Sequence, residues 1–167
     1  MYCYPSPTDK MWNSECEKIM PYLRGRGLNL GSGQRGIYGN EVRVDLNPET
    51  KPDHVCSGDS LPFKDREFDY LYSIHSFEHF EDQKKTIAEW KRVVKKEGII
   101  ALVHPDLTYT KVQREEQWHH DVFNRHFHER TYNEFLEYLK ANNYFGMQLV
   151  ASGEACKEWS FYVVLKV

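Results

Sequence analysis

The chain has 167 residues, with 22 lysines and arginines against 25 aspartates and glutamates, so its formal net charge is -3. This length predicts one domain over residues 1–167, and an apolar share of 40% suffices for a buried core. The charge balance argues against a nucleic-acid partner, and the lack of a long apolar run or signal-peptide pattern predicts a soluble cytoplasmic protein without membrane insertion.

Apolar and amphipathic segments alternate along the chain and predict an α/β fold. In chain order we expect a helix over 9–20; strands over 28–30, 42–45, 54–56 and 68–73; a helix over 83–95; a strand over 99–103; a helix opened by the capping box Thr131-x-x-Glu134; and strands over 147–151 and 161–167. Gly98 is expected to end the second helix. The alternation implies a three-layer sandwich around a mostly parallel sheet of about six to seven strands, with the last two strands as an antiparallel hairpin.

In open parallel sheets, ligands bind beyond the carboxyl ends of the strands. The residues at the expected strand ends are mostly small, acidic or imidazole side chains, which suit a polar ligand. They are residues 31–33, Asp45, 58–59, 73–79 and 104–106.

The glycine turn after the first strand indicates which ligand this is. Gly31-x-Gly33-x-x-Gly36 matches the dinucleotide fingerprint and keeps an NAD-linked oxidoreductase as an alternative. However, only eight residues, 34–41, precede the second strand, too few for the helix whose N-terminus would hold a pyrophosphate. The acidic residue Asp45 follows Gly31 by 14 positions, where the NAD pattern expects about 20. We therefore expect a nucleoside ligand without phosphate, with both ribose hydroxyls bonded to Asp45.

Further motifs follow the glycine turn in a fixed order. They are, with the turn itself, 28–33 (LNLGSG), 44–48 (VDLNP), 58–63 (GDSLPF), 68–73 (FDYLYS), 77–79 (FEH) and 90–98 (WKRVVKKEG). Over about residues 25–106 the chain resembles class I S-adenosylmethionine (SAM)-dependent methyltransferases, and most of all the small type 11-like branch often associated with cell-surface glycan synthesis. Ser32 stands where that branch commonly has cysteine. The resemblance implies a Rossmann-like fold, SAM as cofactor and S-adenosylhomocysteine (SAH) as product.

The resemblance also implies a set of cofactor-binding residues. The glycine turn would line the methionine and ribose, Asp45 would bind the ribose diol, Asp59 and Ser60 would meet the adenine edge, and His79 would lie near the methionine. The full set is Asn29, Gly31, Ser32, Gly33, Asp45, Leu46, Gly58, Asp59, Ser60, Leu61, Ser73, Ile74 and His79. Simpler alternatives exist for several of them: a tight turn for the glycines, a strand-end cap for Asp45, an ordinary loop serine at position 60, and capping or packing of the turn for His79.

Methyl transfer to a hydroxyl benefits from a general base, and histidine is the usual one near neutral pH. His75 and His104 should both face the methyl group, so they are the catalytic candidates; the simpler alternative is that one of them packs or caps a strand end. Asp106 could orient His104, bind the acceptor or start a turn.

Residues 108–128 form a polar and aromatic insert that should lie on the acceptor side of the site. With Asp106, its residues Tyr109, Trp118 and His119 are candidates to bind a small-molecule or glycan-like acceptor. The histidines in the insert do not follow a standard zinc spacing and no cysteine is near, so we expect a solvated or acceptor-lining loop and no metal, with a metal site as the alternative. A protein that binds SAM without catalysing transfer is a further alternative.

Overall fold

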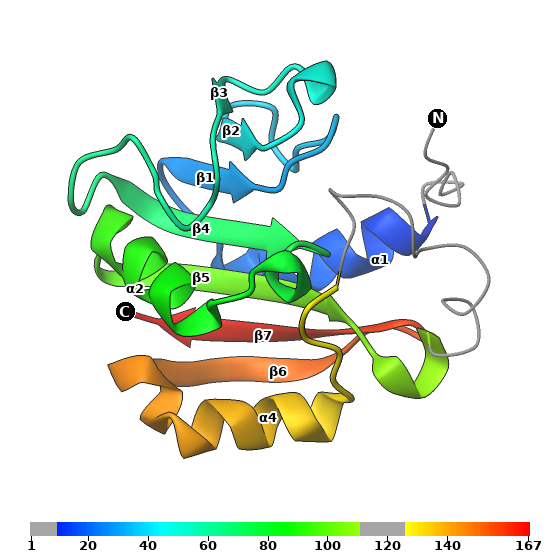
Figure 1. Cartoon of the computed structure of the whole chain (residues 1–167). Helices are drawn as coiled ribbons and strands as arrows, with labels where there is room; N and C mark the ends of the chain where they lie inside the picture. The colour runs from blue at the N-terminus through cyan, green and yellow to red at the C-terminus, as the bar shows by residue number, and fades with distance from the viewer. Residues whose placement is uncertain (1–9, 111–125) are drawn as a thin grey trace.

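The structure is a computed structural model that describes residues 10–110 and 126–167. Its centre is one seven-stranded sheet in the order β3-β2-β1-β4-β5-β7-β6 (Figure 1). The strands are β1 (Gly27–Leu30), β2 (Val42–Asp45), β3 (His54–Val55), β4 (Phe68–Ile74), β5 (Val94–Pro105), β6 (Gln148–Cys156) and β7 (Ser160–Lys166). The first five are mutually parallel, whereas β7 runs antiparallel between β5 and β6. The predicted α/β sheet with a closing antiparallel hairpin is confirmed.

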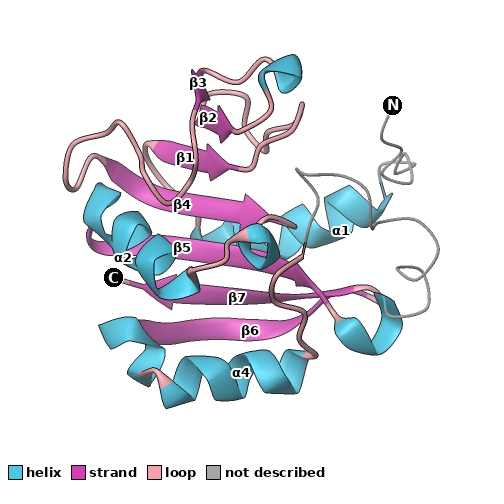
Figure 2. Cartoon of the chain, in the orientation of Figure 1, coloured by secondary structure: helices cyan, strands magenta, loops and turns pink. Residues whose placement is uncertain are grey.

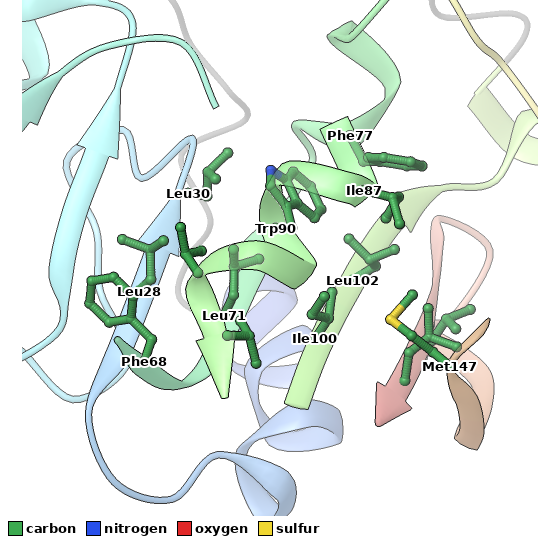
Figure 3. Close-up of a cluster of buried hydrophobic side chains, with 14 of the residues drawn as sticks. Leu28, Leu30, Phe68, Leu71, Phe77, Ile87, Trp90, Ile100, Leu102 and Met147 are labelled. Atoms are coloured by element: carbon green, nitrogen blue, oxygen red, sulfur yellow. The ribbon is translucent and has the colours of Figure 1, made fainter. Parts of the chain in front are cut away.

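Helices cover both faces of this sheet (Figure 2). They are α1 (Lys10–Ile19), α2 (Gln83–Val93) and α4 (Tyr132–Ala141), with short 3-10 turns η1 (Met20–Tyr22), η2 (Pro48–Thr50), η3 (Phe77–His79) and η4 (Asn143–Gly146). Buried side chains of α1, such as Ile19, pack with one face of β4 and β5. Trp90 of α2 and Phe135 of α4 belong to the cluster on the opposite face (Figure 3 shows the α2 part). Each helix therefore buries one apolar stripe, and the sheet is covered on both sides.

The second helix is shorter, and the fifth strand longer, than the sequence pattern predicts. The backbone leaves the helix at Val94, which is fully buried and pairs with Phe68 of β4. Gly98 lies within β5 instead of ending the helix, and a Cβ there would stand 2.7 Å from the carbonyl oxygen of Asp69. Close packing between two strand backbones thus explains this glycine better than a helix stop.

Among the described residues, none of the helices combines the length and the apolar character needed to cross a bilayer.

The predicted capping box of α4 is present. Oε2 of Glu134 accepts the backbone N–H of Thr131 at 2.8 Å, and Oγ1 of Thr131 accepts that of Glu134 at 3.3 Å. Thr131→Ala should lower the free energy of unfolding by about 1 kcal/mol, because an N-cap contact is lost. Urea denaturation measures this, with the exposed Asn133→Ala in the same helical turn as the control. Equal stability of the two variants would contradict the role of the cap.

Candidate functional site

The glycine turn and Asp45 meet at the carboxyl ends of β1 and β2. The backbone N–H groups of Gly31 and Ser32 both bond to the carbonyl of Val44, which joins the turn to the second strand. The N–H of Gly33 then donates to Oδ2 of Asp45 at 2.7 Å. Gly31 and Gly33 have φ values of +67° and +51°, the left-handed region that favours glycine. This geometry holds a partly accessible carboxylate directly beside the turn.

The same turn is fixed from the other side by β4. A Cβ on Gly31 would stand 1.9 Å from Oγ of Ser76, just beyond the end of that strand, whereas a Cβ on Gly33 would meet open space. Asn29 is buried and donates to the carbonyl of Arg35 at 2.7 Å. Ser32 is also buried. Thus Asn29 shapes the turn from beneath, and the backbone at Gly33 is the part open to a ligand.

No helix follows the glycine turn: residues 34–41, all of them described, contain only turns and bends. They are held by the buried Glu41, whose Oε1 accepts the N–H of Tyr38 at 2.8 Å and the hydroxyl of Tyr72 at 3.2 Å. The predicted short crossover is therefore confirmed. Without a helix N-terminus at this point, the turn offers no helix dipole to a pyrophosphate, which removes the physical basis for an NAD site.

The loop after β3 brings Gly58 to the same edge of the sheet. Its carbonyl accepts the indole N–H of Trp90 at 2.9 Å. The carboxylate of Asp59 accepts a bond from Lys85 at 2.8 Å and one from Ser57 at 2.6 Å. The hydrogen bond from Lys85 lowers the pKa of Asp59, so this side chain is anionic at neutral pH. Of the other candidates in these two loops, Leu61 is buried, and Ser60 and Leu46 are exposed.

Beyond β4 the chain turns sharply at His75, which has a φ of +53°. Nε2 of His75 lies 2.7 Å from Oε1 of Glu15, a buried residue of α1. The hydroxyl of Ser160 donates to the same oxygen at 2.6 Å. Glu15 thus links three distant elements and sets the position of the imidazole. The sequence analysis missed it; its signal is an acidic residue on the apolar stripe of the first helix, next to Cys16.

The two strand-end residues before His75 point to opposite faces. Ser73 is buried, and within the described residues its Oγ has no hydrogen-bond partner. Ile74 packs with the cluster beneath α1.

His104 lies on the other side of the sheet from the Glu15–His75 pair. Its ring is 1% exposed, stacks on Phe161 with centroids 5.3 Å apart, and lies 5.2 Å from Phe135 of α4. Burial lowers the pKa of His104. The structure therefore does not bring the two catalytic candidates together, and His104 is enclosed by aromatic rings.

Glu78 lies 3.9 Å from His104, measured from Oε2 to Nε2, and both side chains are buried. Burial raises the pKa of Glu78, but the imidazoles of His104, His79 and His126 outweigh it and lower the pKa to about 2. The ring of His79 stands edge-on to that of His126, with centroids 4.6 Å apart. His79 thus belongs to a histidine-rich group around one buried carboxylate.

The acceptor-side candidates are only partly described. Oδ1 of Asp106 accepts the N–H of Thr108 at 2.9 Å, and Oδ2 accepts that of Tyr132 at 3.3 Å, so this side chain connects the two ends of the insert. Tyr109 is 44% exposed. Trp118 and His119, and residues 111–125 of the predicted insert, lie outside the described residues.

The sequence is similar to a known family model and to one known protein. Residues 27–102 match the family model of a methyltransferase domain. The chain is 31% identical over 121 residues to the uncharacterized protein MJ1123 of Methanocaldococcus jannaschii. That alignment covers 64% of this chain and 59% of the relative, so the chain spans about three-fifths of its relative's length.

Solved structures share the fold at low sequence identity. A chain of the Haloferax volcanii complex between the Trm112 methyltransferase activator and a methyltransferase matches with a TM-score of 0.74 and 16% identity, over 97% of this chain and 92% of that one. A SAM-dependent methyltransferase of Thermotoga maritima matches with a TM-score of 0.64 and 17% identity, over 93% and 88% respectively. These proteins thus share the overall fold of this chain.

Proposed function

We propose that the chain is a class I SAM-dependent methyltransferase, which transfers the methyl group of SAM to a hydroxyl of a small-molecule or glycan-like acceptor. The match of residues 27–102 to the methyltransferase-domain model and the shared fold support this. The observation that carries the proposal is the pairing of Asp45 with the backbone of Gly33 at 2.7 Å, with no helix in the crossover that follows. This arrangement suits a ribose and offers no helix for a pyrophosphate.

The residues at the strand ends fit SAM. A carboxylate has about four acceptor positions, and at Asp45 two are used, by the N–H groups of Gly33 and Asn47. Two remain for the two hydroxyls of a ribose. The left-handed backbone and open space at Gly33 allow a ligand to approach the main chain closely.

The remaining contacts are assigned by position at the same edge. Asp59, which has acceptor positions besides those used by Lys85 and Ser57, would take the adenine amino group, with Leu61 beside the ring. Asn29 would act by shaping the turn. The complete proposed set is Asn29, Gly31, Ser32, Gly33, Asp45, Leu46, Gly58, Asp59, Ser60, Leu61, Ser73, Ile74 and His79. When bound, SAM supplies a sulfonium-activated methyl group.

His75 is the proposed general base. It follows β4 at the ligand edge of the sheet, where the contact of its Nε2 with Oε1 of Glu15 at 2.7 Å sets the position of the ring. A buried carboxylate that holds an imidazole also stabilises the cation formed when the ring takes a proton. His104 is enclosed by Phe135 and Phe161, so we propose that it supports the packing of the site and does not take the proton.

Acceptor recognition would come from the insert, with Tyr109, Trp118 and His119 contacting the acceptor and Asp106 holding the two ends of the insert together. Asp106 receives backbone N–H bonds from Thr108 and Tyr132 on both flanks. Asp106→Ala should therefore lower the affinity for an acceptor more than it lowers the affinity for SAH.

SAH binding tests the proposal directly. SAH should raise the melting temperature and bind with measurable heat, because a ligand of the native state stabilises it. Asp45→Ala should weaken SAH binding at least about tenfold, since hydrogen bonds to a charged group contribute about 1.5–3 kcal/mol. The control is Asp53→Ala, which removes a carboxylate that likewise accepts a backbone N–H, at 2.8 Å from Arg43, outside the site. No SAH binding, or equal affinity in both variants, refutes the cofactor site.

The non-catalytic alternative requires a separate experiment. Transfer of a labelled methyl group from SAM is measured across a panel of hydroxyl, amine and thiol acceptors, including sugars. SAH binding without transfer to any of them would favour a SAM-binding protein that lacks an acceptor site.

A further inference from the structure

Glu78 is a buried carboxylate, and one of its oxygens lacks a hydrogen-bond donor among the described residues. Its side chain is 1% exposed, and within the described part of the chain its Oε2 receives no hydrogen bond. The nearest ring nitrogen of His104, at 3.9 Å, is too distant to donate one and also has no hydrogen-bond partner among the described residues. A buried carboxylate oxygen without a donor is costly, and a bound cation at this oxygen would offset that cost.

Two imidazoles supply ligand atoms around this carboxylate. One ligand atom each of Glu78, His79 and His126 lie within 4.8 Å of one another. Two histidines and one carboxylate form a common donor set for divalent transition metals, which leaves coordination positions open. Ligand atoms around one ion at roughly 2.1 Å lie at most about 4.2 Å apart. That limit applies to two opposite ligands, and three ligands around one ion are about 3.0–3.6 Å apart. Side-chain rotation must therefore bring atoms now up to 4.8 Å apart closer by about 1–2 Å.

The backbone holds the distant histidine in place. The N–H groups of Phe127 and His128 both point to the carbonyl oxygen of Glu78, at 3.0 and 3.3 Å. A ring nitrogen of His128 lies 2.8 Å from the carbonyl oxygen of Glu81. The segment that carries His126 is thus bonded to the same turn that carries the other two ligands. This anchoring makes a chance encounter of flexible surface side chains a poor explanation.

A second carboxylate, Glu129, lies near the third potential ligand. Its Oε1 is 3.6 Å from Nδ1 of His126, which is longer than a hydrogen bond. Glu129 therefore adds negative charge beside the three potential ligands, and this favours a cation at the site.

We propose that Glu78, His79 and His126 bind one divalent transition-metal ion, such as Zn²⁺, Mn²⁺ or Co²⁺. The sequence pattern did not indicate this site, because Glu78 and His79 are adjacent and the third ligand, His126, follows His79 by 47 positions. Its role rests on the proposed function: His79 belongs to the set placed beside the methionine of SAM, so the ion would hold the acceptor oxygen next to the methyl donor. The expectation of no metal, drawn from the spacing within the insert, is revised accordingly.

The test is a titration of the tag-free, metal-stripped full chain with Co²⁺, followed by visible absorption and calorimetry. One Co²⁺ per chain is expected. Glu78→Gln, His79→Ala and His126→Ala should each lower the affinity at least about tenfold, because even supporting residues of metal sites have effects of this size. The control is His54→Ala, which removes an exposed histidine from β3. Because Glu78→Gln alters a buried group, thermal unfolding is recorded, and the partly exposed His126→Ala keeps the test decisive if that variant does not fold.

The same samples are titrated with SAH, so that two failures can be told apart. No saturable Co²⁺ binding, or binding that persists in His126→Ala, overturns the metal site even when SAH binds. Co²⁺ binding that requires the three residues supports the site, and if SAH then fails to bind, only the proposed methyltransferase function is overturned.

Discussion

His75→Ala is expected to lower kcat about 10²–10⁴-fold for an acceptor methylated by the wild-type protein, the usual contribution of a general base. SAH affinity should change little, because the proposed ribose contact is made by Asp45. The prediction follows from the structure because Glu15 and a turn with φ of +53° fix the imidazole at the end of β4. Steady-state kinetics and SAH calorimetry measure the two effects separately.

Glu15→Gln separates positioning from proton transfer. Glutamine keeps the side-chain length and can still accept the hydroxyl of Ser160, but the negative charge beside His75 is lost. A carboxylate stabilises the imidazolium that forms when the ring takes a proton, so its removal should lower kcat by less than His75→Ala does and leave SAH affinity unchanged. His54→Ala is the control and should leave kcat unchanged. If His75→Ala retains full kcat, another group accepts the proton.

The sequence predicted those parts of the fold that depend on local patterns. The short crossover over 34–41, the capping box at Thr131 and the closing hairpin all follow from spacing and turn residues within a few positions. The start of β5 at Val94 did not, because helix periodicity continues through a residue whose conformation is decided by pairing with Phe68, 26 positions earlier. Tertiary pairing there overrides the local preference.

The candidate site likewise contains residues that local patterns predict and residues that only distant contacts place. Asp45 and the glycine turn were predictable because their chemistry is tied to strand ends. The bond of His75 to Glu15 joins residues 60 positions apart, and helix amphipathicity does not reveal which polar residue on a buried stripe has a partner. His126 likewise lies near Glu78 because the backbone N–H groups of Phe127 and His128, at the end of the insert, bond to the carbonyl of Glu78. Contacts between residues distant in the sequence thus place the proposed general base and the proposed metal ligands.

Trp90→Ala should lower the free energy of unfolding by about 3–5 kcal/mol. This is a large share of the total free energy of unfolding of a typical domain, which is about 5–15 kcal/mol. The side chain is fully buried and contacts Phe77 and Phe80, with ring centroids 5.3 and 5.8 Å away. Its removal leaves a cavity between α2 and the sheet (Figure 3). Urea denaturation measures the loss, and a loss below about 1 kcal/mol would contradict this packing role.

Trp90 also connects this core to the ligand edge, because its indole N–H holds the carbonyl of Gly58 beside Asp59. Trp90→Phe keeps an aromatic ring but leaves that buried carbonyl without its donor, which costs about 1–3 kcal/mol. We expect it to weaken SAH binding as well as stability. Ile87→Val removes a methylene from the same helix and the same cluster, at about 0.5–1.5 kcal/mol, without touching the loop. If both variants keep the SAH affinity of the wild-type protein, Trp90 supports only the core. If SAH affinity falls in Trp90→Phe and not in Ile87→Val, the hydrogen bond to Gly58 positions the loop proposed to bind the cofactor.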